Sequence, residues 1–265
     1  MSTPLDDLFV NTRKENRAAL IGFLPAGFPT QPRSISTLTA MIQGGCDAIE
    51  IGFPYSDPVM DGPIIQAASD QSLKQRTGSR EVFATVKAIA PLAPTVVMTY
   101  WNPIERYGVT KFLESMKENG GSGAITPDLT IEESSHWIEE TQRLESNRIF
   151  VVAPSTSDDR LKKVAEASTG FIYAASLMGV TGTRASVSTG AQTLVDRIRR
   201  ITDKPVAVGL GVSTPEQAHE VAQYADGVIV GSAFIRLIQE SKSEEEGISK
   251  VKNLAHALAQ SMKRS

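Results

Sequence analysis

The chain has 265 residues, and 41% of them are hydrophobic, which is enough for one large core. Lys and Arg number 27 against 30 Asp and Glu, so the net charge of −3 gives no reason to expect a nucleic acid or another polyanion as partner. The N-terminus lacks the apolar core of a signal peptide, and no apolar stretch approaches the length of a membrane span, so we expect a soluble, cytoplasmic protein.

Short apolar runs alternate with amphipathic stretches along the whole chain. Eight of the apolar runs mostly lack polar alternation, as is typical of parallel strands covered on both faces. The predicted strands are Ala18–Leu24, Asp47–Phe53, Thr95–Trp101, Gly123–Thr126, Arg148–Ala153, Gly170–Ala175, Pro205–Leu210 and Asp226–Val230.

Helical periodicity occupies the intervals between these strands. The predicted helices are Ile35–Ile42, Glu81–Ile89, Ile131–Leu144, Asp158–Ala167, Ala191–Ile201 and Pro215–Tyr224. In the last of these, Thr214 is the expected N-cap, with Pro215 at the first helical position and Gln217 at the third. An additional helix, Leu5–Arg13, is expected to cap the floor of the fold, and Ile248–Met262 is the expected last outer helix.

Eight strand–helix units in a chain of this length predict an α/β fold, a (β/α)8 TIM barrel that forms a single domain over residues 1–265. We expect the barrel to carry the extra N-terminal helix and extended loops after strands two and six. A doubly wound open sheet is the alternative. The segment Phe53–Arg80 is too long for a plain connection, and long loops of this kind are usually functional.

Two carboxylates near the end of the second strand are the first candidates for chemistry. Glu50 stands alone among Ala48, Ile49 and Ile51, and Asp61 follows in a turn-rich loop. One carboxyl in an apolar setting and one in a wetter loop have pKa values pushed apart, as acid/base catalysis requires. A structural ion pair for Glu50, and a turn or helix-cap role for Asp61, are the alternatives.

Glycine-rich segments after strands six, seven and eight predict a phosphate site. They read MGVTGTR, GLGVST and IVGSAF, and the last opens a helix at Gly231 and Ser232. Glycines let backbone N–H groups approach an anion, and barrel enzymes often bind phosphate at these loops. The pattern indicates a phosphorylated small molecule. His136, His219 and His256 lack ligand spacing, so no metal is expected, and Cys46 has no partner for an internal disulfide.

The motifs EIGFPYSDPVMDGP, MTYWNP, GVTG, GLGVS and VGSAF together resemble the tryptophan synthase alpha subunit family in collinear order. The resemblance implies a lyase of tryptophan biosynthesis that cleaves indole-3-glycerol phosphate to indole and glyceraldehyde 3-phosphate by retro-aldol chemistry. It also implies a beta subunit as partner in an alpha2beta2 heterotetramer. Pyridoxal phosphate then belongs to that partner, and this chain holds no cofactor.

The resemblance also assigns residues. It implies that Glu50 and Asp61 are catalytic. The small residues from Gly182 to Gly190 themselves predict a mobile loop that closes over substrate, with an ordinary disordered surface loop as the alternative. For the substrate, the resemblance implies Tyr173 as the active-site tyrosine, Thr181 as the partner of Asp61 on loop closure, Gly182, Gly211, Gly231 and Ser232 as phosphate ligands, and Phe23, Tyr100 and Ile125 as the indole pocket. For the beta subunit, it implies contacts by the long loop containing Asp57-Pro58 and by the Asn102-Pro103 region.

Some positions depart from the family pattern, and rival functions stay open. Leu177-Met178, Leu210 and Pro127 differ from the well-known enteric version. The alternatives are another phosphate-binding TIM-barrel isomerase, a barrel that only binds ligand and regulates a partner, and a stand-alone indole-releasing lyase. No strand end carries a lysine, which disfavours a Schiff-base aldolase.

Overall fold

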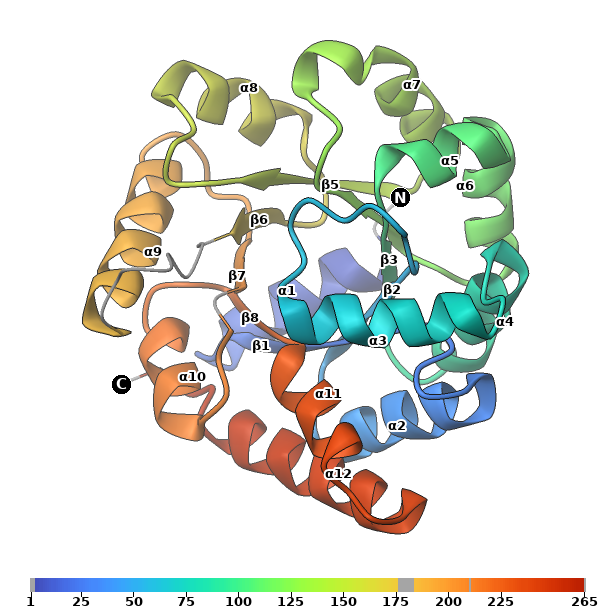
Figure 1. Cartoon of the computed structure of the whole chain (residues 1–265). Coiled ribbons are helices and arrows are strands. Elements are labelled where there is room, and N and C mark those ends of the chain that lie inside the picture. Colours follow the sequence, from blue (N-terminus) through green and yellow to red (C-terminus); the bar gives the residue numbers. More distant parts are fainter. Residues whose placement is uncertain (1–2, 176–183, 210, 265) are drawn as a thin grey trace.

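The structure is a computed structural model that describes residues 3–175, 184–209 and 211–264, with residues 184–189 described by their backbone alone. Eight parallel strands form a closed barrel in sequence order (Figure 1). The strands are β1 (Ala19–Pro25), β2 (Ala48–Gly52), β3 (Thr95–Met98), β4 (Gly123–Thr126), β5 (Asn147–Val152), β6 (Ile172–Ala175), β7 (Val206–Gly209) and β8 (Gly227–Val230). The predicted TIM barrel is confirmed, and the open-sheet alternative is wrong because β1 pairs with β8.

Alternate residues of each strand point into the barrel and form its interior core. This core contains Ala19, Ile21, Ala48, Val96, Ile125, Ile149, Phe171, Ala207 and Ile229. Helix α1 (Pro4–Lys14) adds Leu5 and Phe9 to the same cluster, and the ring of Phe9 lies 5.6 Å from that of Phe171. Because Phe171 precedes β6, α1 closes the barrel at the amino ends of the strands, which confirms the predicted floor helix.

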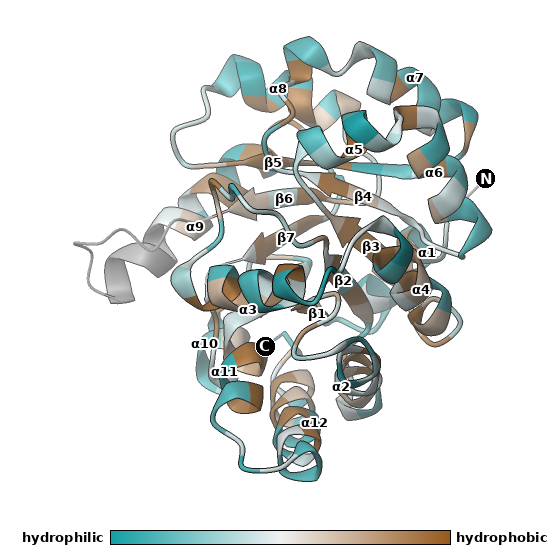
Figure 2. Ribbon diagram, turned by 45° about the vertical axis from the view of Figure 1, so that its right-hand side comes forward, coloured by the Kyte–Doolittle hydropathy of each residue, from teal (hydrophilic) through white to brown (hydrophobic). Residues whose placement is uncertain are grey.

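The outer helices bury their apolar sides against the strands (Figure 2). They are α2 (Gln31–Gly44), α4 (Ser79–Ile89), α6 (Val109–Glu118), α7 (Ser135–Arg143), α8 (Asp158–Ala167), α9 (Arg184–Arg199), α10 (Pro215–Ala222) and α12 (Glu244–Gln260). Thr214 caps α10 as predicted, since its hydroxyl accepts the Gln217 N–H at 3.3 Å. Within the described ranges, no helix combines the length and apolar character that crossing a membrane requires.

Four elements differ from the expected pattern. Helix α3 (Pro63–Lys74) forms inside the long segment after β2 and crosses in front of the barrel in Figure 1, whereas α1 lies behind it. Helix α5 (Trp101–Tyr107) begins where the third strand was expected to continue, so that strand ends at Met98. The others are α6, for which no helix was expected, and the 3-10 turn Ile131–Glu133, which separates from α7 at Ser134. Helix α11 (Ser232–Gln239) is the helix expected to begin at Gly231 and Ser232.

The expectation of a loop from Gly182 to Gly190 is wrong over most of this segment, because α9 already begins at Arg184. Helical hydrogen bonding therefore reaches further toward the barrel than the small residues of this segment suggested. Residues 176–183, which connect β6 to α9, lie outside the described residues, and Gly179, Thr181 and Gly182 are among them.

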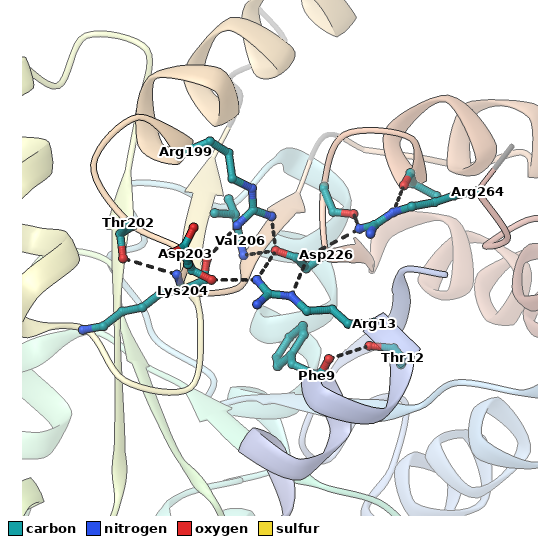
Figure 3. A network of polar contacts seen from close by, with 12 residues as sticks. Phe9, Thr12, Arg13, Arg199, Thr202, Asp203, Lys204, Val206, Asp226 and Arg264 are labelled. Atoms are coloured by element: carbon teal, nitrogen blue, oxygen red, sulfur yellow. Dashed lines mark hydrogen bonds and ion pairs between the residues drawn. The ribbon is translucent and has the colours of Figure 1, made fainter. Parts of the chain in front are cut away.

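A polar network joins both ends of the chain to the barrel floor (Figure 3). Asp226, which is 3% exposed and precedes β8, accepts hydrogen bonds from Arg13, Arg199 and Arg264. Its Oδ2 also accepts the backbone N–H of Val206 at 2.9 Å. Burial alone would raise the pKa of Asp226, but its hydrogen bonds to arginines hold that pKa below the usual range.

Candidate active site

Glu50 lies inside the barrel, near the carboxyl end of β2. Ala48 belongs to the interior core, so Glu50, two residues later, points to the same side of the sheet. Its side chain is 1% exposed, and its Oε2 has no hydrogen-bond partner among the described residues. Burial, with a smaller contribution from the charge of Asp61, raises the pKa of Glu50 to about 8. The unpartnered Oε2 does not support the structural ion pair considered above. With its raised pKa, the carboxyl group is protonated at neutral pH.

Asp61 lies in the loop that follows β2, close enough to Glu50 to influence its charge. Asp61 is partly buried, so it is less solvated than expected. Burial raises its pKa to about 6, and a hydrogen bond from the Tyr100 hydroxyl limits this rise. The N-cap of α3 is Gly62, so Asp61 does not cap that helix. Both pKa values are raised but remain separated, so at neutral pH Asp61 is mostly ionised and Glu50 mostly protonated.

Tyr100 does more than line a pocket. It is 4% exposed, and its Oη accepts the backbone N–H of Met60 at 3.1 Å in addition to bonding Asp61. Its ring packs against that of Tyr55, with centroids 5.2 Å apart. A side chain at the end of β3 therefore anchors the loop that carries Asp61.

Tyr173 completes the group of polar side chains inside the barrel mouth. It packs against the interior core from β6, and a Cβ atom at Gly209 would lie 2.4 Å from its Oη. Burial first, then the charges of Glu50 and Asp61, raise the pKa of Tyr173 well above its usual value. Three elements thus place Glu50, Asp61 and Tyr173 within electrostatic reach of one another.

The predicted phosphate end lies at the same mouth, after β7 and β8. Gly211 adopts φ +69°, a left-handed conformation that only glycine adopts readily. Gly231 precedes α11, whose first-turn N–H groups have no acceptor within the helix, and the first helical bond runs from Ile235 N–H to the Gly231 carbonyl at 3.2 Å. Ser232 is the first residue of that helix, so its N–H belongs to an end that attracts anions.

The remaining predicted residues fall into two groups. Phe23 lies on β1 near the mouth, and Ile125 lies on β4 in the interior core, as expected of pocket residues. Thr181 and Gly182, with the departures Leu177, Met178 and Leu210, lie outside the described residues. The interpretation of the sequence missed Tyr55 and the space-making role of Gly209. Gly209 comes two residues after Ala207 on the same strand, and this alternation could have indicated that Gly209 faces the barrel interior.

Comparisons with known proteins agree over the whole chain. A family model described as Tryptophan synthase alpha chain matches residues 9–264. The tryptophan synthase alpha chain of Streptomyces avermitilis is 50% identical over 261 residues, covering 98% of this chain and 94% of that one. The alpha chain of Thermobifida fusca is 49% identical over 261 residues, covering 97% of each chain.

Solved structures agree as well. A structure of Mycobacterium tuberculosis tryptophan synthase shares 45% identity and a TM-score of 0.92, with 100% of both chains covered. Tryptophan synthase subunit alpha from Legionella pneumophila shares 27% identity and a TM-score of 0.90, with 99% of both chains covered. Sequence and fold are therefore similar to these proteins from end to end.

Proposed function

Because the chain belongs to the tryptophan synthase alpha chain family, and is thus a lyase that cleaves indole-3-glycerol phosphate into indole and glyceraldehyde 3-phosphate, we propose that Glu50 and Asp61 are its catalytic residues. The observation that carries this proposal is the buried Glu50 carboxyl, which has an unpartnered Oε2 and a pKa raised to about 8. Such a group can hold its proton at neutral pH and donate it to substrate.

Cleavage requires two proton transfers and stabilisation of the charge that develops on the indole ring. Glu50 donates a proton to indole C3, which turns the ring into a leaving group, and then takes the proton of the side-chain hydroxyl next to the breaking bond. Asp61 accepts a hydrogen bond from the indole N–H and stabilises the positive charge that develops on the ring. The separate pKa values of about 8 and about 6 suit these two roles.

The rest of the mouth holds the substrate in this proposal. Backbone N–H groups at Gly182, Gly211, Gly231 and Ser232 bind the phosphate, and the helix end at α11 favours its charge. The indole ring lies among Phe23, Tyr100 and Ile125, beside Tyr173. Thr181 hydrogen-bonds Asp61 once substrate is bound. The retro-aldol step uses side-chain acids and bases, and we assign no cofactor or metal to this chain.

We propose the tryptophan synthase beta subunit as partner in an alpha2beta2 heterotetramer, with pyridoxal phosphate held by that subunit. The two segments expected to contact it lie together, because the Asn102 side chain donates to the Tyr55 hydroxyl at 3.1 Å. Between Tyr55 and Asp61, Val59 is 76% exposed, an apolar side chain suited to burial in an interface. One domain over residues 1–265 and a cytoplasmic location are parts of the same proposal.

The direct test is indole release from indole-3-glycerol phosphate by the purified chain, measured with and without an added beta subunit. We expect release in both conditions and a faster rate with the partner. Ligand binding without turnover in either condition would support the regulatory barrel, and an unchanged high rate without the partner would support a stand-alone lyase.

The pH dependence of kcat/KM for indole release is expected to be bell-shaped. Activity rises as Asp61 ionises through its pKa of about 6 and falls as Glu50 loses its proton through its pKa of about 8. Measurement across this range with the isolated chain checks the prediction. A profile whose activity keeps rising above the Glu50 pKa would contradict the role of Glu50 as proton donor.

Tyr100→Phe is expected to move the acidic limb of that profile to higher pH. The substitution removes the hydroxyl that bonds Asp61 and limits the rise of its pKa, so Asp61 ionises later. Tyr107→Phe is the matched control, because the Tyr107 hydroxyl contacts Ser115 on an outer helix. An acidic limb at the same pH in wild type and Tyr100→Phe would show that this hydrogen bond does not tune Asp61.

A further inference from the structure

Two glycines on neighbouring strands leave the space that the ring of Phe23 occupies. Phe23 lies on β1, which pairs with β2 on one side and with β8 on the other. A Cβ atom at Gly52, the last residue of β2, would lie 2.8 Å from Cζ and 2.9 Å from Cε2 of the ring. A Cβ atom at Gly231, just after β8, would lie 2.7 Å from Cδ1. The ring therefore spans the end of β1, with one edge over each glycine.

This position places the ring one residue step nearer the barrel mouth than Glu50. Phe23 and Glu50 are register partners across β1 and β2. Gly52 follows Glu50 by two residues, so it faces the same side one step nearer the mouth. The far edge of the ring lies beside Gly52, one step nearer the mouth than Glu50, and Phe23 itself is only 5% exposed.

We propose that Gly52 and Gly231 form a slot that fixes the ring of Phe23 over Glu50, so that Phe23 acts as a positioning residue that excludes water from the catalytic carboxyl. This inference rests on the proposed function for the role of Glu50. It gives Gly231 a second role besides the proposed phosphate binding, and it assigns a role to Gly52, which is not among the proposed binding residues. Carbon atoms rarely approach within 3.0 Å, so a methyl group on either glycine must displace the ring.

The electrostatic surroundings of Glu50 allow the prediction to be specific. Among the described residues, the titratable groups coupled to Glu50 are Asp61 and Tyr173, and neither lies on β1 or β8. Burial is the largest cause of the raised pKa of Glu50. If the ring moves away, water reaches the carboxyl and its pKa falls toward the ordinary value.

Gly52→Ala, Phe23→Leu and the double variant form a cycle that tests the slot. Leucine has no Cζ or Cε2 atom, so the added methyl group meets the ring only when Phe23 is present. We expect each single variant to shift the basic limb of kcat/KM downward by about half a pH unit or more. In the Phe23→Leu background, Gly52→Ala should cause little further shift.

A second readout measures Glu50 without activity. The infrared carbonyl band of its protonated carboxyl, identified by its loss in Glu50→Gln, is titrated in wild type and variants. Gly231→Ala, which meets the ring from the other strand, serves if Gly52→Ala does not fold. The control is Gly78→Ala, where the nearest atom to the added Cβ is 3.8 Å away.

The outcomes separate the two proposals. A lower Glu50 titration midpoint in Gly52→Ala or Gly231→Ala, absent in Gly78→Ala, supports the slot. An unchanged midpoint in both, or shifts that add in full across the cycle, would overturn it. A wild-type chain that releases no indole even with the beta subunit would contradict the proposed function, while the infrared titration would still decide whether the slot controls Glu50.

Discussion

Glu50→Gln is expected to lower the rate of indole release by about 10²–10⁴-fold, the usual contribution of a general acid/base group. Glutamine fills the same space inside the barrel but can neither donate the proton that indole C3 requires nor accept the one from the hydroxyl. The loss should fall on kcat more than on KM, because the phosphate and indole contacts remain. Near-normal turnover by purified Glu50→Gln with the beta subunit would contradict the assignment.

The same substitution is expected to stabilise the folded chain at high pH. The pKa of Glu50 is about 8 in the fold against an ordinary 4.5, so the folded state holds this proton more tightly than the unfolded state. The resulting stability is complete below the ordinary value and is lost as the pH rises to about 8. Thermal unfolding should show Glu50→Gln melting above wild type at the upper end of this range, with a smaller difference at the lower end.

This pair of effects distinguishes a catalytic carboxyl from a structural one. If Glu50 were held in an ion pair, its replacement by glutamine would destabilise the folded protein, because the charge of its partner would be left uncompensated. A variant that is less active and also melts below wild type at high pH would favour the structural alternative. The catalytic proposal requires lower activity together with unchanged or greater stability.

Asp226→Ala is expected to lower the free energy of unfolding by about 3 kcal/mol, the lower part of the range for breaking a buried ion pair. The substitution removes the carboxylate shared by Arg13, Arg199 and Arg264 and leaves the Val206 N–H without its acceptor (Figure 3). The lower part applies because the arginine side chains are 23–40% exposed, so water partly replaces the lost partner.

Urea denaturation of the purified variant measures this effect, and Asp203→Ala is the matched control. Asp203 lies in the same network, but it contributes its backbone carbonyl, which accepts from Arg13 at 2.8 Å and survives the substitution. Indole release per folded molecule should stay near wild type in Asp226→Ala, because Asp226 precedes β8 at the barrel floor, opposite the mouth. A change in unfolding free energy equal to that of Asp203→Ala would contradict the proposed stabilising role of Asp226.

The linear pattern of the chain predicted parallel strands covered by helices and the position of the main acid. The count of eight strand–helix units favoured a barrel over an open sheet, and the pairing of β1 with β8 decided between them. A lone carboxylate within such a run must be buried, so Glu50 could be identified without coordinates. The N-terminal floor helix and the Thr214 cap were predictable because their signals are local.

The remaining features depend on residues distant in sequence, and only the tertiary structure decided them. Helices α3 and α5 lie where polar and aromatic residues hide any clear period. Helix α3 packs against β1 and α11, and α5 packs against α6. Tyr100 meets Asp61, Phe23 lies across Gly52 and Gly231, and Asp226 collects three arginines, all through contacts that strand pairing and closure create. Local sequence specifies backbone conformation and burial, whereas the partner of a buried polar group or ring is set by which strands become neighbours.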